Sequence, residues 1–474
     1  MSSLRTGPLP TSSELPTSVL VALNDDTTFL APRLLSGGTP WRLLRLNDAS
    51  AAVVNSWRTP QPVTPRTRAL ARRLVSYGMA HVVANAPQSI DDIDVVVTAY
   101  NNVAHLEQSL ASLSGFSLTV VDDASPGLEV ERLVAAYGAR YVRRARNGGP
   151  SAARNEGARA TTRPFIWFLD ADVRLSDARS TARRLVSAFV DPLVAVVAPR
   201  VVGEVGATSR ERFEESHSPL DMGTTSGLVV PLTTRGYVPA AAVMVRRDAF
   251  GDGFDEILRV GEDVDFVWRL SDNGWLVCYD AETQVRHPAR ETLASWCAQR
   301  HAYGTSAADL ALRHPDRLAP VRADGLTMAA WTSLLMGKPR WALAALALAR
   351  RSFAAQLPTD VPDALRIARR VVTRGMAEAG LPLSRAVVRT YLPLLVLALA
   401  VRPLRRPALV LLLAGTAARW RASGIPRPAD LAWSLLDDAS YSSGVWRGAA
   451  RRGAWTAVTP HVSVPALARR RRPT

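Results

Sequence analysis

Cysteine, lysine and long apolar runs are scarce in this chain of 474 residues. Its two cysteines, Cys278 and Cys297, make neither a disulfide framework nor a CxxC metal pair, so we expect buried thiols in a reducing compartment. The first twenty residues lack a basic start followed by an apolar core, and we therefore expect no signal peptide. These absences argue against a small disulfide-stabilised secreted protein and favour a cytoplasmic location.

Basic charge is concentrated in the last part of the chain, although Lys338 is the only lysine. The whole sequence has 58 basic and 42 acidic residues, a net charge of +16. Residues 290–474 hold 28 basic and 10 acidic residues, so the rest of the chain has a balance of −2. Such asymmetry suggests an anionic partner, either membrane lipid or nucleic acid. We expect the end at 469–472 to be a disordered basic tail.

The segment after residue 300 is predicted to be helical and basic, and to contain three short apolar runs: 341–349, 391–401 and 408–415. Each run is shorter than the roughly 18 to 20 apolar residues that one membrane-spanning helix needs. Arg402, Arg405 and Arg406 separate the last two runs. Two interpretations stay open, namely helices that lie in the interface of an anionic membrane and a buried helical core with an arginine-rich surface.

Residues 19–85 are predicted to form a small separate module, followed by a linker at 85–92. Its predicted elements are strands at 20–23 and 41–46, helices at 49–57 and 66–77, and a last strand at 79–84. This order of strands and helices is typical of a winged-helix fold.

Residues 92–300 are predicted to form an α/β domain with a mostly parallel sheet, because strand and helix patterns alternate there. The predicted strands are 94–98, 118–121, 140–142 and 165–169, and the predicted helices are 103–113, 128–137 and 151–160. In open α/β sheets, ligands bind outside the carboxyl ends of the strands. The residues that follow these strands are therefore the candidates for a functional site.

Carboxylates follow two of these strand ends. Asp123 ends the strand at 118–121, and Asp170 and Asp172 follow the strand at 165–169. A single D-x-D pattern has little weight, since about one is expected by chance in a chain of this length. Gathered at strand ends, however, carboxylates suit a hard divalent cation and a phosphorylated ligand. The alternatives are that Asp123 is a turn residue and that the other two cap the next segment.

Three further positions complete the candidate site. Arg154 lies in the first turns of a helix that follows two glycines, a setting that suits phosphate, although it could be a surface residue. Glu262 and Asp263 precede a predicted helix at 266–270, and Asp263 is a candidate general base, a role worth about 10² to 10⁴ in rate. An acidic first helical turn is the alternative. His287 follows a predicted strand at 275–279 and is a candidate third metal ligand, or a structural histidine.

Five ordered segments, DVVVTAYNN, VVDDAS, RNGGPSAARNEG, FLDADV and GEDVDFVWRL, resemble the inverting glycosyltransferases of the family-2 type with a GT-A fold. The resemblance covers residues 93–300 and implies a nucleoside-diphosphate sugar donor, Mg²⁺ or Mn²⁺, and direct displacement with inversion. It implies nucleotide contacts from Thr98, Tyr100, Asn101, Asp123, Arg154 and Asp170. It also implies metal ligation by Asp170, Asp172 and His287, and a base formed by Asp263 with Glu262.

Two further patterns refine the resemblance. The Q-x-x-R-W motif of processive synthases is absent after residue 290, where the chain has Gln299-Arg300-His301, which argues against a membrane-embedded polysaccharide synthase. The front module is similar to PqqD-like peptide-recognition modules. This pairing resembles the glycosyltransferases of mycofactocin biosynthesis in actinobacteria, which implies UDP-glucose as donor and a peptide-derived redox cofactor as acceptor.

Two alternatives stay open. One is a cell-envelope polysaccharide or lipid glycosyltransferase at the cytoplasmic face of the membrane, with peripheral contact to anionic lipid. The other is a nucleic-acid or peptide binding protein. We expect no nucleic acid as partner, because a DNA-binding protein has no need of ordered carboxylates.

Overall fold

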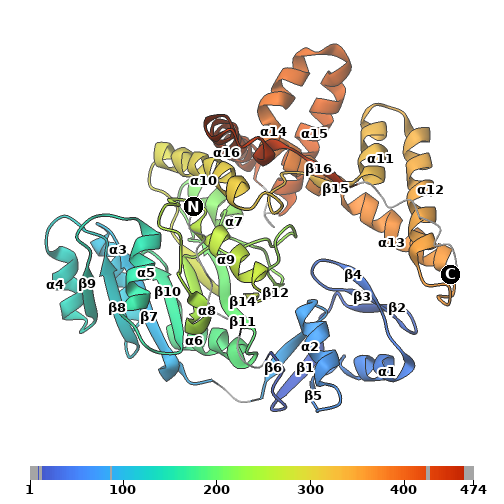
Figure 1. Cartoon of the computed structure of the whole chain (residues 1–474). Helices are drawn as coiled ribbons and strands as arrows, with labels where there is room; N and C mark the ends of the chain where they lie inside the picture. The colour runs from blue at the N-terminus through green and yellow to red at the C-terminus, as the bar shows by residue number, and fades with distance from the viewer. Residues whose placement is uncertain (1–8, 10–12, 86–87, 423–426, 464–474) are drawn as a thin grey trace. The chain divides into compact units, whose positions relative to one another are not determined.

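The computed structural model describes residues 9, 13–85, 88–422 and 427–463, and the chain divides into two compact units, Met1–Ala289 and Arg290–Thr474 (Figure 1). The basic tail predicted at 469–472 lies outside the described residues, as does part of the linker predicted at 85–92. The first unit contains the small module and the α/β domain. The second unit is largely helical, as the sequence indicates.

The N-terminal module has two small antiparallel sheets, β5-β1-β6 and β2-β3-β4. Its elements are β1 (Val19–Leu23), β2 (Thr28–Ala31), β3 (Leu34–Gly37), β4 (Arg42–Arg45), α1 (Asp48–Ser56), β5 (Gln61–Pro62), α2 (Arg68–Ser76) and β6 (Ala80–Ala84). The buried side chains of Trp57, Leu74 and Met79 are part of its core. The predicted strands and helices are present, whereas the hairpin of β2 and β3 and the short strand β5 were not predicted.

The central sheet of the described first unit has eight strands in the order β12-β14-β11-β13-β10-β7-β8-β9. Their bounds are β7 (Ile93–Ala99), β8 (Ser117–Asp122), β9 (Arg140–Arg143), β10 (Phe165–Asp170), β11 (Val194–Gly203), β12 (Gly227–Leu228), β13 (Ala242–Arg246) and β14 (Leu276–His287). Strands β10, β7, β8 and β9 pair in parallel, whereas β13 is antiparallel to both β10 and β11. The predicted α/β domain is therefore confirmed, with an antiparallel strand that was not predicted.

Helices cover both faces of this sheet because the side chains of a strand alternate between them. The helical segments are η1 (Ile90–Asp92), α3 (Val103–Ser112), α4 (Glu129–Ala136), α5 (Pro150–Arg159), α6 (Ala178–Ser187), η2 (Ala188–Val190), α7 (Ser209–His217), α8 (Arg247–Phe250) and α9 (Glu262–Asp272). Val95 and Val97 of β7 share a buried core with α3, α4 and α6, while Val96 meets α5 on the other face. A Cβ at Gly157 of α5 would lie 2.2 Å from the Val96 side chain, so glycine permits this close approach.

The second unit is built from helices and one small sheet of two parallel strands, β15 and β16. Its elements are α10 (Leu293–Arg313), β15 (Arg322–Asp324), α11 (Gly325–Leu335), α12 (Pro339–Gln356), α13 (Ala364–Glu378), α14 (Gly380–Ala400), α15 (Arg402–Ala422), α16 (Pro428–Arg452), η3 (Trp455–Val458) and β16 (His461–Ser463). The described residues include one stretch, Ala364–Ala400, that is long and apolar enough to cross a membrane by length and composition. This stretch was not predicted from the sequence, because arginines interrupt its apolar run.

Helices α10 and α16 pack at very short range through glycines. A Cβ at Gly444 of α16 would lie 2.0 Å from the carbonyl oxygen of His301, and a Cβ at Gly304 of α10 would lie 2.1 Å from that of Tyr441. Neither helix can move away freely, because a buried ion pair between Arg300 and Asp437 also joins them.

We expect Gly444→Ala to destabilise the full-length protein by about 1 to 3 kcal/mol, because the added methyl group must push the two backbones apart. Gly375→Ala is the matched control, since this helical glycine of α13 has no atom within 4 Å of its Cβ position. The control is expected to stabilise its helix by up to about 1 kcal/mol. Thermal unfolding of both variants tests the packing, and equal effects of the two changes would contradict it.

Candidate active site

The parallel pairing of β7 and β10 brings the first candidate residues together. Asp170 at the end of β10 lies opposite Thr98 on β7, and the Thr98 hydroxyl donates a hydrogen bond to Asp170 Oδ1 at 3.4 Å. The backbone N–H of Asp170 also bonds to the carbonyl of Ala241, just before β13. The carboxylate is thus fixed at the carboxyl edge of the sheet, where ligands of α/β proteins bind.

Asp170, Asp172 and His287 form a cluster in which one ligand atom from each residue lies within 4.8 Å of the others. A short antiparallel bridge explains how they meet, because Arg174 and Arg286 exchange backbone hydrogen bonds of 2.8 and 3.0 Å. The predicted end of the last strand at residue 279 was wrong. Strand β14 continues to His287, and this continuation carries the imidazole to the two aspartates.

The orientation of His287 suits a metal ligand. Its Nδ1 lies 2.9 Å from the carbonyl oxygen of Pro288, and because a carbonyl only accepts, Nδ1 carries a hydrogen. Its Nε2 then faces Asp172 Oδ1 at 3.3 Å. Burial disfavours the charged imidazole, but the adjacent Asp172 carboxylate outweighs burial and raises the pKa of His287. Two carboxylates and one oriented imidazole are a donor set that fits a divalent cation.

Arg154 on α5 joins the metal cluster to the start of α9. Its guanidinium donates to Asp170 Oδ1 at 2.8 Å and to Glu262 Oε1 at 3.0 Å, and it lies over the ring of Phe254. Burial opposes its charge, but Asp170 and Glu262 more than compensate and raise the pKa of Arg154. Arg154 is therefore a buried bridge between two carboxylates, and the surface-residue alternative was wrong.

Asp263 occupies the first turn of α9, beside Glu262. Its carboxylate accepts hydrogen bonds from the backbone N–H of Val264 at 2.8 Å and of Ala240 at 3.3 Å. The residue is half-buried. Desolvation first, and the neighbouring Glu262 carboxylate second, raise the pKa of Asp263 to about 7. A carboxylate with this pKa can accept a proton near neutral pH, as a general base must.

Asp123 holds the glycine loop before α5. Its carboxylate accepts from the backbone N–H groups of Gly148 at 2.9 Å and Gly149 at 2.7 Å, and it pairs with Arg144 at 2.5 Å. Gly149 is the N-cap of α5 with φ of 86°, a left-handed conformation that favours glycine. Asp123 thus fixes the backbone that presents the helix N-terminus.

Tyr100 and Asn101 follow β7 at the same edge of the sheet. The side chain of Tyr100 is 52% exposed. Asn101 has a positive φ of 52°, and its backbone N–H bonds to the Ser125 hydroxyl. These two residues are placed near the strand ends by the chain, and their predicted nucleotide contacts stay predictions.

Two contributions to the site were missed from the sequence. The N–H of Ala240 binds Asp263, and the ring of Phe254 supports Arg154. The pattern of side chains in a sequence does not reveal a backbone donor. Nothing in the sequence around Phe254 distinguishes it from other phenylalanines of the core.

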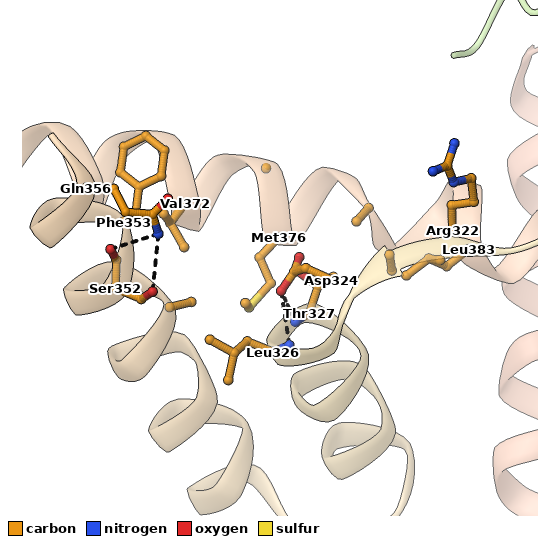
Figure 2. A pocket seen from close by; sticks show the side chains of 14 residues that line it. Arg322, Asp324, Leu326, Thr327, Ser352, Phe353, Gln356, Val372, Met376 and Leu383 are labelled. Carbon is orange, nitrogen blue, oxygen red and sulfur yellow. Dashed lines mark hydrogen bonds between the residues drawn. The ribbon is translucent and has the colours of Figure 1, made fainter. Parts of the chain in front are cut away.

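A cavity of about 400 Å³ lies elsewhere, among β15, α11, α12 and α13 of the second unit (Figure 2). Two of its polar side chains are engaged locally, since Asp324 accepts from the N–H groups of Leu326 and Thr327, and Gln356 donates to Ser352. The remaining lining is mostly apolar. The cavity therefore lacks the convergent carboxylates of the sheet edge and is not the candidate active site.

Comparisons with known proteins identify the family of the chain. A profile of glycosyl transferase family 2 matches residues 94–254. Over 450 residues the chain is 36% identical to the pre-mycofactocin glycosyltransferase of Mycobacterium tuberculosis (strain CDC 1551 / Oshkosh), covering 90% of this chain and 94% of that protein. The protein of the same name from strain ATCC 25618 / H37Rv has the same identity and coverage.

Solved structures are more distant. The mannosyltransferase PcManGT from Pyrobaculum calidifontis, in complex with GDP-Man and Mn²⁺, is 16% identical with a TM-score of 0.40, over 77% of this chain and 89% of that chain. Glucosyl-3-phosphoglycerate synthase from Mycobacterium tuberculosis is 19% identical with a TM-score of 0.32, over 47% of this chain and 79% of that chain. Similarity at this level has no weight for function.

Proposed function

This chain belongs to glycosyl transferase family 2, and from that premise we propose that it transfers glucose from UDP-glucose to a hydroxyl of a peptide-derived redox cofactor of the mycofactocin type. Its first unit contains the GT-A domain of that family. The observation that carries the proposal is the linkage through Arg154 of two carboxylate pairs, Asp170 with Asp172 and Glu262 with Asp263. One pair suits a divalent cation that would bind the donor diphosphate, and the other suits an acceptor hydroxyl.

The proposed chemistry is a single displacement. Asp263 removes the proton of the acceptor hydroxyl, and the oxygen attacks the anomeric carbon of the sugar. The bond from that carbon to the diphosphate breaks on the opposite side, so the configuration inverts. Asp263 keeps the proton until it is released to water, and the pKa of about 7 suits this exchange. The N–H groups of Ala240 and Val264 hold the carboxylate in place during the transfer.

Asp170, Asp172 and His287 are proposed to hold Mg²⁺ or Mn²⁺. Such a cation, when bound, acts as a Lewis acid that neutralises the charge of the leaving diphosphate. Arg154 holds Asp170 from the other side, and Thr98 contributes a hydroxyl hydrogen bond to the same oxygen. The N-terminus of α5, whose loop is held by Asp123, is proposed to face the nucleotide.

The N-terminal module is proposed to bind the peptide-derived part of the acceptor, as its resemblance to PqqD-like modules implies. Glu262 is proposed as a positioning residue, because its carboxylate is engaged by Arg154. Asp263 beside it is then the base.

Transfer with the purified full-length protein tests the proposal. The experiment uses Mn²⁺, a panel of nucleotide sugars, and two acceptor preparations, the peptide-derived cofactor precursor and a lipid extract. We expect cation-dependent transfer from UDP-glucose to the precursor, and the anomeric configuration of the product reports inversion. Transfer only to lipid would favour a cell-envelope glycosyltransferase, and no binding of any nucleotide sugar would overturn the enzyme proposal.

We expect Asp172→Ala to weaken Mn²⁺ binding at least tenfold, since even outer-shell partners of metal ligands contribute about 10- to 100-fold in affinity. Asp177→Ala is the control from the same loop. Asp177 is exposed and caps α6 by accepting from the N–H of Ser180, so its loss costs about 1 kcal/mol of stability and leaves Mn²⁺ binding unchanged. Titration of Mn²⁺ by calorimetry separates the two, and equal affinities would refute the metal cluster.

A further inference from the structure

The hairpin of α14 and α15 is apolar on more than one side. Helix α14 kinks at Tyr391, next to Pro393, and packs along α15 (Figure 1). Val388, Leu395 and Ala408 are buried in the core of this hairpin. The contact between the two helices is thus already made by one set of apolar side chains.

A second set of apolar side chains faces outward and is 41–66% exposed: Leu394, Val396, Leu397, Val401, Leu404, Leu409, Val410 and Leu413. Leu394, Leu397 and Val401 recur at helical spacing and form one continuous stripe. A helix that is apolar all round is normally buried in protein or lipid. Of the most apolar part of Ala364–Ala400, however, 22% is buried inside the protein. The described residues of the chain therefore leave this surface uncovered.

The hairpin itself carries charge of one sign. Between Glu378 and Asp430 the sequence has eight arginines and no acidic residue. Three of the arginines, at positions 402, 405 and 406, lie at the turn and the first turns of α15. Three other arginines of the hairpin, at positions 385, 389 and 419, pair with Asp437 and Asp438 of α16. The ion pairs of the described residues give the turn arginines no acidic partner, and an apolar surface with such a positive turn matches an anionic lipid bilayer.

We propose that the α14–α15 hairpin docks the protein on an anionic membrane by lying in the interface between headgroups and acyl chains. The proposal stands apart from the proposed function, because it concerns a different unit of the chain. Interfacial helices bury their apolar face about 5 to 10 Å deep and keep their basic side chains at the headgroups.

A spanning arrangement does not fit the contacts of α14. Arg385 and Arg389 of this helix pair with Asp438 and Asp437 of α16, so the first half of α14 is held inside the unit. The part beyond the kink, residues 392–400, is about 13 Å long at about 1.5 Å per residue. This is less than half of the roughly 30 Å hydrocarbon core.

Perpendicular insertion of the hairpin is also disfavoured, because it would place the arginines of the turn in hydrocarbon. Each arginine placed in hydrocarbon would weaken membrane binding by on the order of a hundredfold. A hairpin that lies flat keeps Arg402 and Arg406 at the phosphates. Near an anionic surface each arginine then strengthens binding about fivefold.

The same pattern recurs in α12 of the same unit. Trp341 and Leu343 are 58% and 66% exposed, and Lys338 and Arg340 precede them. The sequence between Asp324 and Asp360 has no acidic residue. Tryptophan is enriched at membrane interfaces, where its ring spans the apolar and polar layers.

Flotation of the full-length protein with vesicles tests the proposal. Vesicles of phosphatidylcholine alone are compared with vesicles that also contain phosphatidylglycerol. We expect binding to the anionic vesicles, and at least a tenfold loss in the double variant Leu397→Glu, Leu413→Glu. Both side chains are about two-thirds exposed, so the changes leave the core intact. The matched control, Val205→Glu with Ile257→Glu, alters two apolar residues of the first unit that are even more exposed, and should bind as the parent does.

A second variant separates charge from apolar contact. We expect Arg402→Gln with Arg406→Gln to lose about tenfold or more in binding to the anionic vesicles at low salt, and less at high salt. Failure of the parent to bind, or unchanged binding by the glutamate double variant, would overturn the proposal. Light scattering without vesicles tests whether a second copy of the chain covers the apolar surface instead. A dimer of the parent that dissociates in the glutamate variant would assign the surface to a second copy of the chain and would also overturn the membrane proposal.

Discussion

Asp263→Asn is expected to lower kcat/KM for sugar transfer by about 10² to 10⁴, while leaving the affinity for UDP-glucose and Mn²⁺ nearly unchanged. The amide keeps the shape of the side chain but cannot take the proton of the acceptor hydroxyl. Under the proposed function, donor binding depends on Asp170, Asp172 and Arg154, none of which the change removes. Steady-state kinetics with separate donor titration distinguish a lost base from a lost binding site.

The same substitution is expected to change how the stability of the protein depends on pH. The pKa of Asp263 is raised to about 7 in the folded chain, so the folded state holds a proton that the unfolded state loses above about pH 4. The wild-type protein therefore loses stability as pH rises from about 4 to about 7. The amide of the variant has no proton to lose, so the melting temperature of the variant, relative to the wild type, rises over this window and stays constant above it.

The pH dependence of the wild-type rate has the same origin. Without bound ligand, Asp263 is ionised above about pH 7 and protonated below it, so kcat/KM should rise about tenfold per pH unit below about pH 7 and level off above it. Asp272→Asn, at the exposed end of the same helix, is the control and should show neither effect. A variant at position 263 with wild-type kinetics would assign the base to another residue.

Asp437→Ala is expected to destabilise the full-length protein by about 3 to 5 kcal/mol. Asp437 is 2% exposed and pairs with Arg300 at 2.9 Å, with Arg389 at 3.1 Å and with Arg419. Burial would raise the pKa of Asp437, but Arg419, Arg389 and Arg300 hold it far below its ordinary value. Without this carboxylate, the buried guanidinium of Arg300 loses its charged partner.

The stabilisation from Asp437 has a defined pH window. Since its pKa is depressed in the folded state, the contribution is present above the unfolded value of about 3.9 and is lost as pH falls below that value. Asp309→Ala is the matched control on the same pair of helices. Asp309 pairs with Arg452 at 3.1 Å near the surface, where such pairs contribute at most about 1 kcal/mol. Chemical unfolding at neutral pH compares the two, and equal losses would contradict a special role for the buried network.

Local patterns were enough to predict much of the α/β domain. Runs such as residues 94–98 and 165–169 became the buried strands β7 and β10, and the acidic residues after β10 lie at the sheet edge. The strands and the acidic residues at their ends can both be predicted from short stretches of sequence, since they depend on side-chain alternation, apolar content and the residue that ends a strand.

The pairing of distant residues could not be predicted in this way. Arg154 meets Glu262 across 108 positions, and Arg300 meets Asp437 across 137. The antiparallel strand β13 and the bridge from Arg174 to Arg286 depend on how the sheet is ordered, which no local pattern encodes. For the same reason the sequence could propose His287 as a ligand, but not the strand extension that brings it to Asp172.

The charge balance around Arg154 and His287 has a consequence for the order of binding events. Among the described residues, the carboxylates at positions 170, 172, 262 and 263 lie around this one guanidinium and this one imidazole. This excess of negative charge repels a nucleoside diphosphate. Under the proposed function, UDP-glucose arrives after or together with its cation, and UDP departs the same way. Turnover then depends on free cation concentration even when the sugar donor is abundant.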